Sequence, residues 1–117
     1  MAGLNLNINY KGAENFPTFW KISTTIFKEI GDGNIETPGP YFEFHVDCYM
    51  SEAASIEGPY VNRMNDTKIC RITDINTIQS ILAAGDVPAI QTFVYNLLKS
   101  FTFPGESTPF FANATDA

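Results

Sequence analysis

The chain has little positive charge. Of its 117 residues only seven are Lys or Arg, against thirteen Asp or Glu, and the formal net charge is −6. The basic residues are scattered singly, whereas a surface that binds nucleic acid needs clustered cations to displace the counterions of phosphate. We therefore expect no direct binding to nucleic acid, and the acidic charge disfavours an anionic membrane surface as well.

Cysteine is too rare for a disulfide framework. Cys48 and Cys70 stand where an apolar residue would fit in a strand pattern, so buried free thiols are the preferred interpretation. A single bridge between them stays open, provided that their strands are neighbours. No stretch approaches the ~18 apolar residues of a membrane-spanning helix. We expect a soluble protein of a reducing cytosol that carries no cofactor.

Apolar and aromatic side chains are abundant. Hydrophobic residues make up 44% of the chain and aromatic residues 14%, which is typical of a globular domain. A length of 117 residues predicts a single domain, residues 1–117, with one core. Strand patterns precede helix patterns, so we expect an α+β fold: an antiparallel sheet of about four strands with one main C-terminal helix packed on one face.

The N-terminal residues 1–12 contain a strand of unusual composition. In LNLNINY, residues 4–10, apolar residues alternate with asparagine, which predicts a half-buried strand. Asparagine is a poor strand former, so this segment is expected at a sheet edge or as an arm that reaches a neighbouring subunit. The candidate contact residues on its polar face are Asn5, Asn7 and Asn9.

Residues 19–30 predict a second strand, because their β-branched side chains favour a strand over a helix. Phe27 breaks the polar side of its pattern. We expect the strand to pair with residues 41–50 as a long hairpin. The apolar face of the strand is expected to carry Trp20, Ile22, Ile26 and Ile30.

The segment GDGNIETPGP, residues 31–40, joins these two strands. Three Gly and two Pro in ten residues interrupt regular structure, so we predict a hairpin loop. Long loops on small domains are frequent contact surfaces, and Ile35 is the apolar candidate there.

The strand YFEFHVDCYM, residues 41–50, holds the single histidine of the chain between two acids. Successive side chains of a strand point to opposite faces, so one face is polar and the other apolar. The polar face is expected to carry Tyr41, Glu43, His45, Asp47 and Tyr49. The apolar face, expected in the core, is Phe42, Phe44, Val46, Cys48 and Met50.

The polar face of this strand is the best candidate for chemistry. Side chains two residues apart on a strand are about 6.5 Å apart at the backbone, close enough to converge on one metal ion. One His with two carboxylates is an acceptable ligand set. The same alternation is typical of any half-solvated strand, which is the preferred interpretation. Glu43, His45 and Asp47 are therefore metal candidates only, and no catalytic residue is assigned.

Nucleophilic catalysis is disfavoured by the same alternation. Cys48 points to the face opposite His45, and burial would raise the pKa of either thiol and so remove the thiolate. The chain also lacks a Gly-X-Ser-X-Gly elbow and a phosphate-binding glycine pattern.

The second half of the chain contains one more strand and two helices. Residues 51–66 are a connection that begins with a helical turn, and residues 67–72 predict a short strand. A short helix is predicted through about Ala84, capped by Thr73 or Asp74. Its apolar face is expected to be Ile75, Ile78 and Leu82.

The strongest helix pattern spans residues 87–101. Asp86 supplies an N-cap, and Pro88 stands in the first turn, where its missing N–H costs nothing. The apolar face is expected to be Ile90, Phe93, Val94, Leu97, Leu98 and Phe101. In the tail, residues 104–117, we expect Phe110 and Phe111 to dock on this core or on a partner.

Three stretches resemble small structural proteins of tailed bacteriophage virions: FWKISTTIF, YMSEAASIEGPYV, and YNLLKSF followed by FFANATDA. In such proteins a Trp-Lys-Ile strand pairs with a strand that ends in an aromatic-X-Ser/Lys-Glu-Ala segment, and a late Tyr-X-X-Leu-Lys helix leads to an acidic terminus. The resemblance covers patches of residues 19–117. It implies a non-enzymatic subunit of the tail, baseplate or neck, which assembles in the host cytoplasm with copies of itself and other virion proteins.

Two other classes of function stay open. The first is a small metal- or acid/base-using enzyme centred on Glu43, His45 and Asp47. The second is an acidic inhibitor of a basic host protein, which requires the carboxylates to form one dense face.

Overall fold

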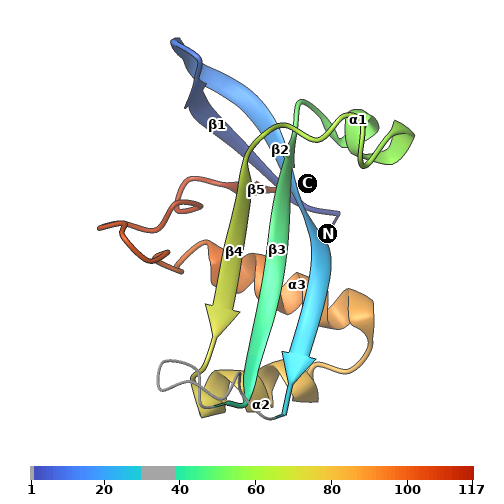
Figure 1. Cartoon of the computed structure of the whole chain (residues 1–117), viewed down its shortest axis with the longest axis vertical. Helices are drawn as coiled ribbons and strands as arrows, with labels where there is room; N and C mark the ends of the chain where they lie inside the picture. Colours follow the sequence, from blue (N-terminus) through green and yellow to red (C-terminus); the bar gives the residue numbers. More distant parts are fainter. Residues whose placement is uncertain (1, 30–38) are drawn as a thin grey trace.

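A computed structural model describes residues 2–29 and 39–117 of the chain. Its elements are β1 (Leu4–Tyr10), β2 (Ala13–Lys28), β3 (Tyr41–Tyr49), α1 (Glu52–Glu57), β4 (Thr67–Ile72), α2 (Ile75–Ala83), α3 (Val87–Leu98) and β5 (Thr115–Asp116). In this part of the chain five strands form one antiparallel sheet in the order β4-β3-β2-β1-β5, and α2 and α3 lie behind it in Figure 1.

The α+β class is confirmed, and two of its details are corrected. The sheet has five strands rather than four, because the last residues of the chain return and pair with β1. The longest helix, α3, is not the last element, since β5 follows it. No helix in the described ranges is long and apolar enough to cross a membrane.

The N-terminal strand lies in its own sheet and is not an arm. β1 pairs with β2 along its length, and β5 covers its other side only at Leu4 and Asn5. The hairpin turn is tight because Lys11 and Gly12 both have a positive φ, 47° and 83°. β2 consequently begins at Ala13, six residues before the predicted start at Phe19.

A bulge in β2 changes which side chains reach the core. Ile22 pairs with Val46 and Thr24 pairs with His45, so Ser23 is the extra residue. The alternation reverses there, because one added residue moves all later side chains to the other face. Phe27 therefore packs beside Phe42 on the face that the helices cover, with ring centroids 4.6 Å apart. Ile26, predicted on that face, lies opposite Glu43 on the other face, and Ile30 is outside the described residues.

The core lies between this face of the sheet, α2, α3 and the tail. Its fully buried side chains come from every layer: Trp20, Phe44, Val46, Cys48, Ile81, Val94, Tyr95, Leu98 and Phe111. Both cysteines are free and buried on neighbouring strands, opposite Trp20 and Phe44 respectively. Cys70 pairs with Phe44, which lies four residues from Cys48 along β3, so the two thiols do not face each other and are not bridged.

The caps of α2 and α3 are as predicted, but their buried residues and the end of α3 differ from the prediction. Asp74 and Asp86 cap α2 and α3 as predicted, accepting from the N–H groups of Thr77 and Ala89. In α2 the buried residues are Ile78 and Ile81, whereas the predicted Ile75 and Leu82 are half exposed, because the helix contacts the core through one narrow stripe. In α3 the buried set includes Tyr95, which was not predicted, and the helix ends at Leu98 rather than at residue 101.

The C-terminal tail docks on its own core. The rings of Phe110 and Phe111 both meet Trp20 edge-on, each at a centroid distance of 5.3 Å. The two ends of the chain are then joined, because the Ala2 N–H donates to the Ala117 carbonyl and the Ala117 N–H donates to Gly3. Phe111 is fully buried, so of the two expected outcomes for this residue, docking on the core or on a partner, the structure shows the first.

Candidate functional site on the outer face of the sheet

The face of the sheet that α2 and α3 leave uncovered, here called the outer face, holds the predicted polar residues. Tyr41 and Tyr49, predicted to be solvated there, are in fact buried, while Met50, predicted in the core, is exposed because β3 ends before it. Tyr49 is covered by the segment that follows α1, and its hydroxyl donates to the Pro59 carbonyl at 2.8 Å. The outer face is therefore only partly open to solvent.

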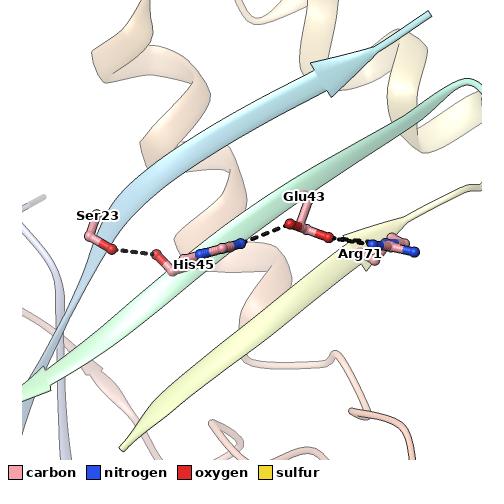
Figure 2. A network of polar contacts seen from close by, with 4 residues as sticks. All are labelled: Ser23, Glu43, His45 and Arg71. Carbon is pink, nitrogen blue, oxygen red and sulfur yellow. Dashed lines mark hydrogen bonds and ion pairs between the residues drawn. The ribbon is translucent and has the colours of Figure 1, made fainter. Parts of the chain in front are cut away.

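Glu43 and His45 meet on this face, with Arg71 beside them (Figure 2). His45 Nε2 lies 2.8 Å from Glu43 Oε2, and Arg71 donates to Glu43 Oε1 through Nη2 at 2.6 Å and Nε at 3.1 Å. Glu43 and Arg71 are direct cross-strand partners in β3 and β4. The hydrogen bond from His45, followed by those from Arg71, lowers the pKa of Glu43 below its ordinary value.

Asp47 is separate from this pair. Its cross-strand partner Thr67 donates a hydroxyl hydrogen bond to Asp47 Oδ1 at 2.8 Å, and Arg63 Nη1 lies 3.9 Å from Oδ2. The predicted trio is thus divided, because each acid bonds to a different residue of β4. Within residues 2–29 and 39–117 no three His, Cys, Asp or Glu side chains are grouped to hold a metal ion.

The imidazole of His45 has no described nucleophile beside it. Ser23 lies next to it in Figure 2, but its hydroxyl donates to the backbone carbonyl of His45, at 3.3 Å, and not to the ring. Cys48 and Cys70 lie on the other face of the sheet, where burial raises the pKa of each thiol to about 12. The arrangement can hold the His45 ring in one orientation against Glu43.

A hollow of about 390 Å³ lies between the outer face and the segment after α1. Its polar and aromatic lining includes Lys21, Asp47, Tyr49, Tyr60 and Arg63. Burial, and then the charge of Asp47, raise the pKa of Tyr49. Sequence periodicity did not indicate Tyr60 or Arg63, because they belong to a connection without a repeating pattern.

Large apolar side chains are exposed on several elements of the described chain, including Phe27, Ile69 and Val87, and two further groups of them lie around α1 and on α2. The first, the α1 patch, consists of Met50, Ile56, Tyr60 and Val61, which are 62–90% exposed. The second, the α2 patch, consists of Ile75 and Leu82, which are 50% and 53% exposed and seven residues apart, so they share one face of α2. In Figure 1 α1 lies in the upper part of the molecule, below the tip of the β1–β2 hairpin, and α2 lies at the lower end of the longest axis, which measures 40 Å.

The other predicted contact residues are in three different situations. Asn5, Asn7 and Asn9 are exposed on β1, Phe110 is partly buried against Trp20, and Ile35 lies outside the described residues.

No family model, curated protein or solved structure matches this chain. The resemblance to bacteriophage structural proteins accordingly stays a prediction. The geometry of the described residues is then the basis on which a function can be proposed.

Proposed function

We propose that the chain is a non-enzymatic structural subunit of a tailed bacteriophage virion, in the tail, baseplate or neck, and that copies of it join head to tail. The observation that carries the assembly is that the α1 patch and the α2 patch are two separate apolar surfaces, which lie apart along the molecule (Figure 1). Exposed apolar groups of this kind mark contact surfaces on soluble proteins. When two different surfaces join, each added copy presents the next free surface, and the product is a ring or a filament.

Lys68 protects the free edge of the sheet at β4. Its side chain lies on the face that the helices cover, and its Nζ is 3.3 Å from Glu106 Oε1 and 4.2 Å from the centroid of the Phe110 ring. A charged side chain that points inward from an edge strand discourages pairing with the edge of another sheet. Contacts through the two patches are favoured over edge-to-edge pairing.

The described residues give less support to the two alternative functions, a small metal- or acid/base-using enzyme and an acidic inhibitor of a basic protein. Among the described residues no third metal ligand groups with Glu43 and His45, and the Ser23 hydroxyl bonds to the His45 carbonyl and not to its ring. Several acids have structural partners and do not form one dense face: Asp74 and Asp86 cap helices, while Glu106 and Asp116 pair with lysines.

The test is molar mass by light scattering across a concentration series, with one variant for each patch. Tyr60→Asp and Leu82→Asp each place a charge in one patch, and both residues are exposed, so the fold should persist. We expect the wild type to form a closed ring or a growing filament and each variant alone to remain monomeric. Asn96→Asp, which adds the same charge at an exposed position of α3, is the control and should assemble normally.

Mixing the two patch variants separates head-to-tail assembly from a two-fold dimer. Each variant keeps one intact patch, so an equimolar mixture should form heterodimers and nothing larger. A wild-type chain that stays monomeric at every concentration, or a mixture that assembles as fully as the wild type, would contradict the proposal. Negative-stain microscopy of the wild type should show rings or tubes.

A further inference from the structure

The asparagine-rich strand at the N-terminus lines a polar hollow on the outer face. This asparagine hollow has a volume of about 330 Å³. Its lining residues are Asn5, Leu6, Asn7, Asn15, Asn113 and Thr115. The self-assembly proposed above uses none of them.

Three separate segments bring these side chains together. Asn5 and Asn7 point to the outer face because they alternate with buried leucines in β1. Asn15 belongs to a second bulge of β2, where the register with β1 shifts, and its φ of 52° is a left-handed conformation that asparagine tolerates. The tail supplies the last two side chains, since Thr115 of β5 pairs with Asn5 and Asn113 lies just before it.

The lining is neutral and can both donate and accept hydrogen bonds. No residue that lines the hollow is charged. A side-chain amide offers two N–H donors and a carbonyl acceptor, and the hydroxyl of Thr115 is also both donor and acceptor. Within the described part of the chain, the four amide side chains have no hydrogen-bond partner, so they are available to a ligand.

These properties narrow the chemistry of the ligand. An anion would need a cationic side chain, and a hard cation such as Ca²⁺ is held mainly by carboxylates, neither of which lines the hollow. A peptide strand would need apolar pockets for its side chains, but Leu6 is the one large apolar residue of the lining and is 7% exposed. A sugar presents neighbouring hydroxyl groups, each of which donates and accepts, and this matches an array of amides.

We propose that the asparagine hollow is a binding site for a neutral carbohydrate. The amides of Asn5 and Asn7 form one wall, and those of Asn15 and Asn113 form the others. The bulge of β2 at Asn15, with its left-handed backbone conformation, turns the Asn15 side chain to the same face as Asn5 and Asn7 of β1. The C-terminal strand completes the site, so the ligand bridges the two ends of the chain.

The test is a titration followed by ¹⁵N–¹H correlation spectra of the full chain, with the methyl glycosides of glucose, galactose and N-acetylglucosamine as probes. We expect at least one glycoside to shift the side-chain amide signals of the lining asparagines in a saturable way. Asn15→Gly removes the amide while keeping a residue suited to a positive φ. It should weaken binding about fivefold to tenfold, as expected for the loss of one hydrogen bond.

Asn9→Ala is the matched control, because Asn9 is an exposed asparagine of the same strand that does not line the hollow. It should bind the glycoside as the wild type does. The proposal is overturned by the absence of a saturable shift with all three glycosides, by shifts confined to another surface, or by equal binding of Asn15→Gly and the wild type. Shifts produced by a neutral Ala/Ser tetrapeptide and by no glycoside would also overturn it.

Discussion

The hydroxyl of Tyr95 accepts a hydrogen bond from the backbone N–H of Ile22 at 2.8 Å, although the residues are 73 positions apart in the chain. The same hydroxyl lies 3.5 Å from the Ala2 carbonyl, to which it donates. β1 and β2 stop pairing at Leu4 and Trp20, so the hydroxyl occupies the place of the next ladder bond. One side chain of α3 thereby completes the sheet where two strands separate.

Replacing Tyr95 by Phe should lower the free energy of unfolding by about 1–3 kcal/mol, because the buried N–H of Ile22 would lose its acceptor. Urea denaturation followed by circular dichroism measures the difference. Tyr60→Phe is the control: Tyr60 is 85% exposed, so no loss is expected. Equal stabilities for the wild type and Tyr95→Phe would show that the hydroxyl does not replace a ladder bond.

Phe111→Ala should cost about 3–5 kcal/mol, the range for truncating a buried aromatic side chain. Phe111 is 0% exposed and meets Trp20, Phe103 and Phe110 edge-on. Phe110→Ala should cost clearly less, because Phe110 is only partly buried. Thermal melts of the two variants compare them directly. A small loss for Phe111→Ala would mean that the tail is not part of the core.

The contribution of Glu43 to stability should depend on pH. Its folded-state pKa lies below the ordinary 4.5, first because of the hydrogen bond with His45 and then because of Arg71. The ionised carboxylate of Glu43 therefore stabilises the folded state fully at a pH above the ordinary pKa of 4.5. This stabilisation is lost as the pH falls through the lower folded-state pKa. Glu43→Gln should cost about 1 kcal/mol near neutral pH and progressively less in acid.

Denaturation curves of the wild type and Glu43→Gln, recorded from neutral to acidic pH, check this dependence. Glu14→Gln, at an exposed position in β2, is the control, and its free energy of unfolding should equal that of the wild type at every pH. A difference for Glu43→Gln that stays constant through the acid range would refute the linkage.

The two thiols should be nearly inert in the folded protein. Burial raises the pKa of Cys48 and of Cys70 to about 12, so at neutral pH each has far less thiolate than an ordinary cysteine. Labelling with iodoacetamide should become fast only when urea unfolds the chain. An added cysteine at the exposed position Ser107 provides the reactive reference. Labelling of the native thiols as fast as that reference would contradict their burial.

Local patterns in the sequence were sufficient for most elements. The alternation of Leu and Asn predicts β1 with its correct bounds, residues 4–10, and Asp86 followed by Pro88 predicts the start of α3. These features depend on side chains within one turn or one strand, so nearby residues specify them. The same holds for the outward direction of Asn5 and Asn7, and for the shared face of Glu43 and His45.

Contacts between distant segments decided the rest. The bulge at Ser23 reverses the pattern of β2, because its register is set by β3, and this exchanges the faces of Ile26 and Phe27. Asp47 interacts with Thr67 and Arg63 and not with His45, and periodicity within one strand cannot place these two partners. The sequence by itself thus determined the class of fold, the strands and the capped helices, since these follow from local spacing. Only the tertiary structure decided the register, the fifth strand and the grouping of polar side chains into sites, because those depend on which distant segments pack together.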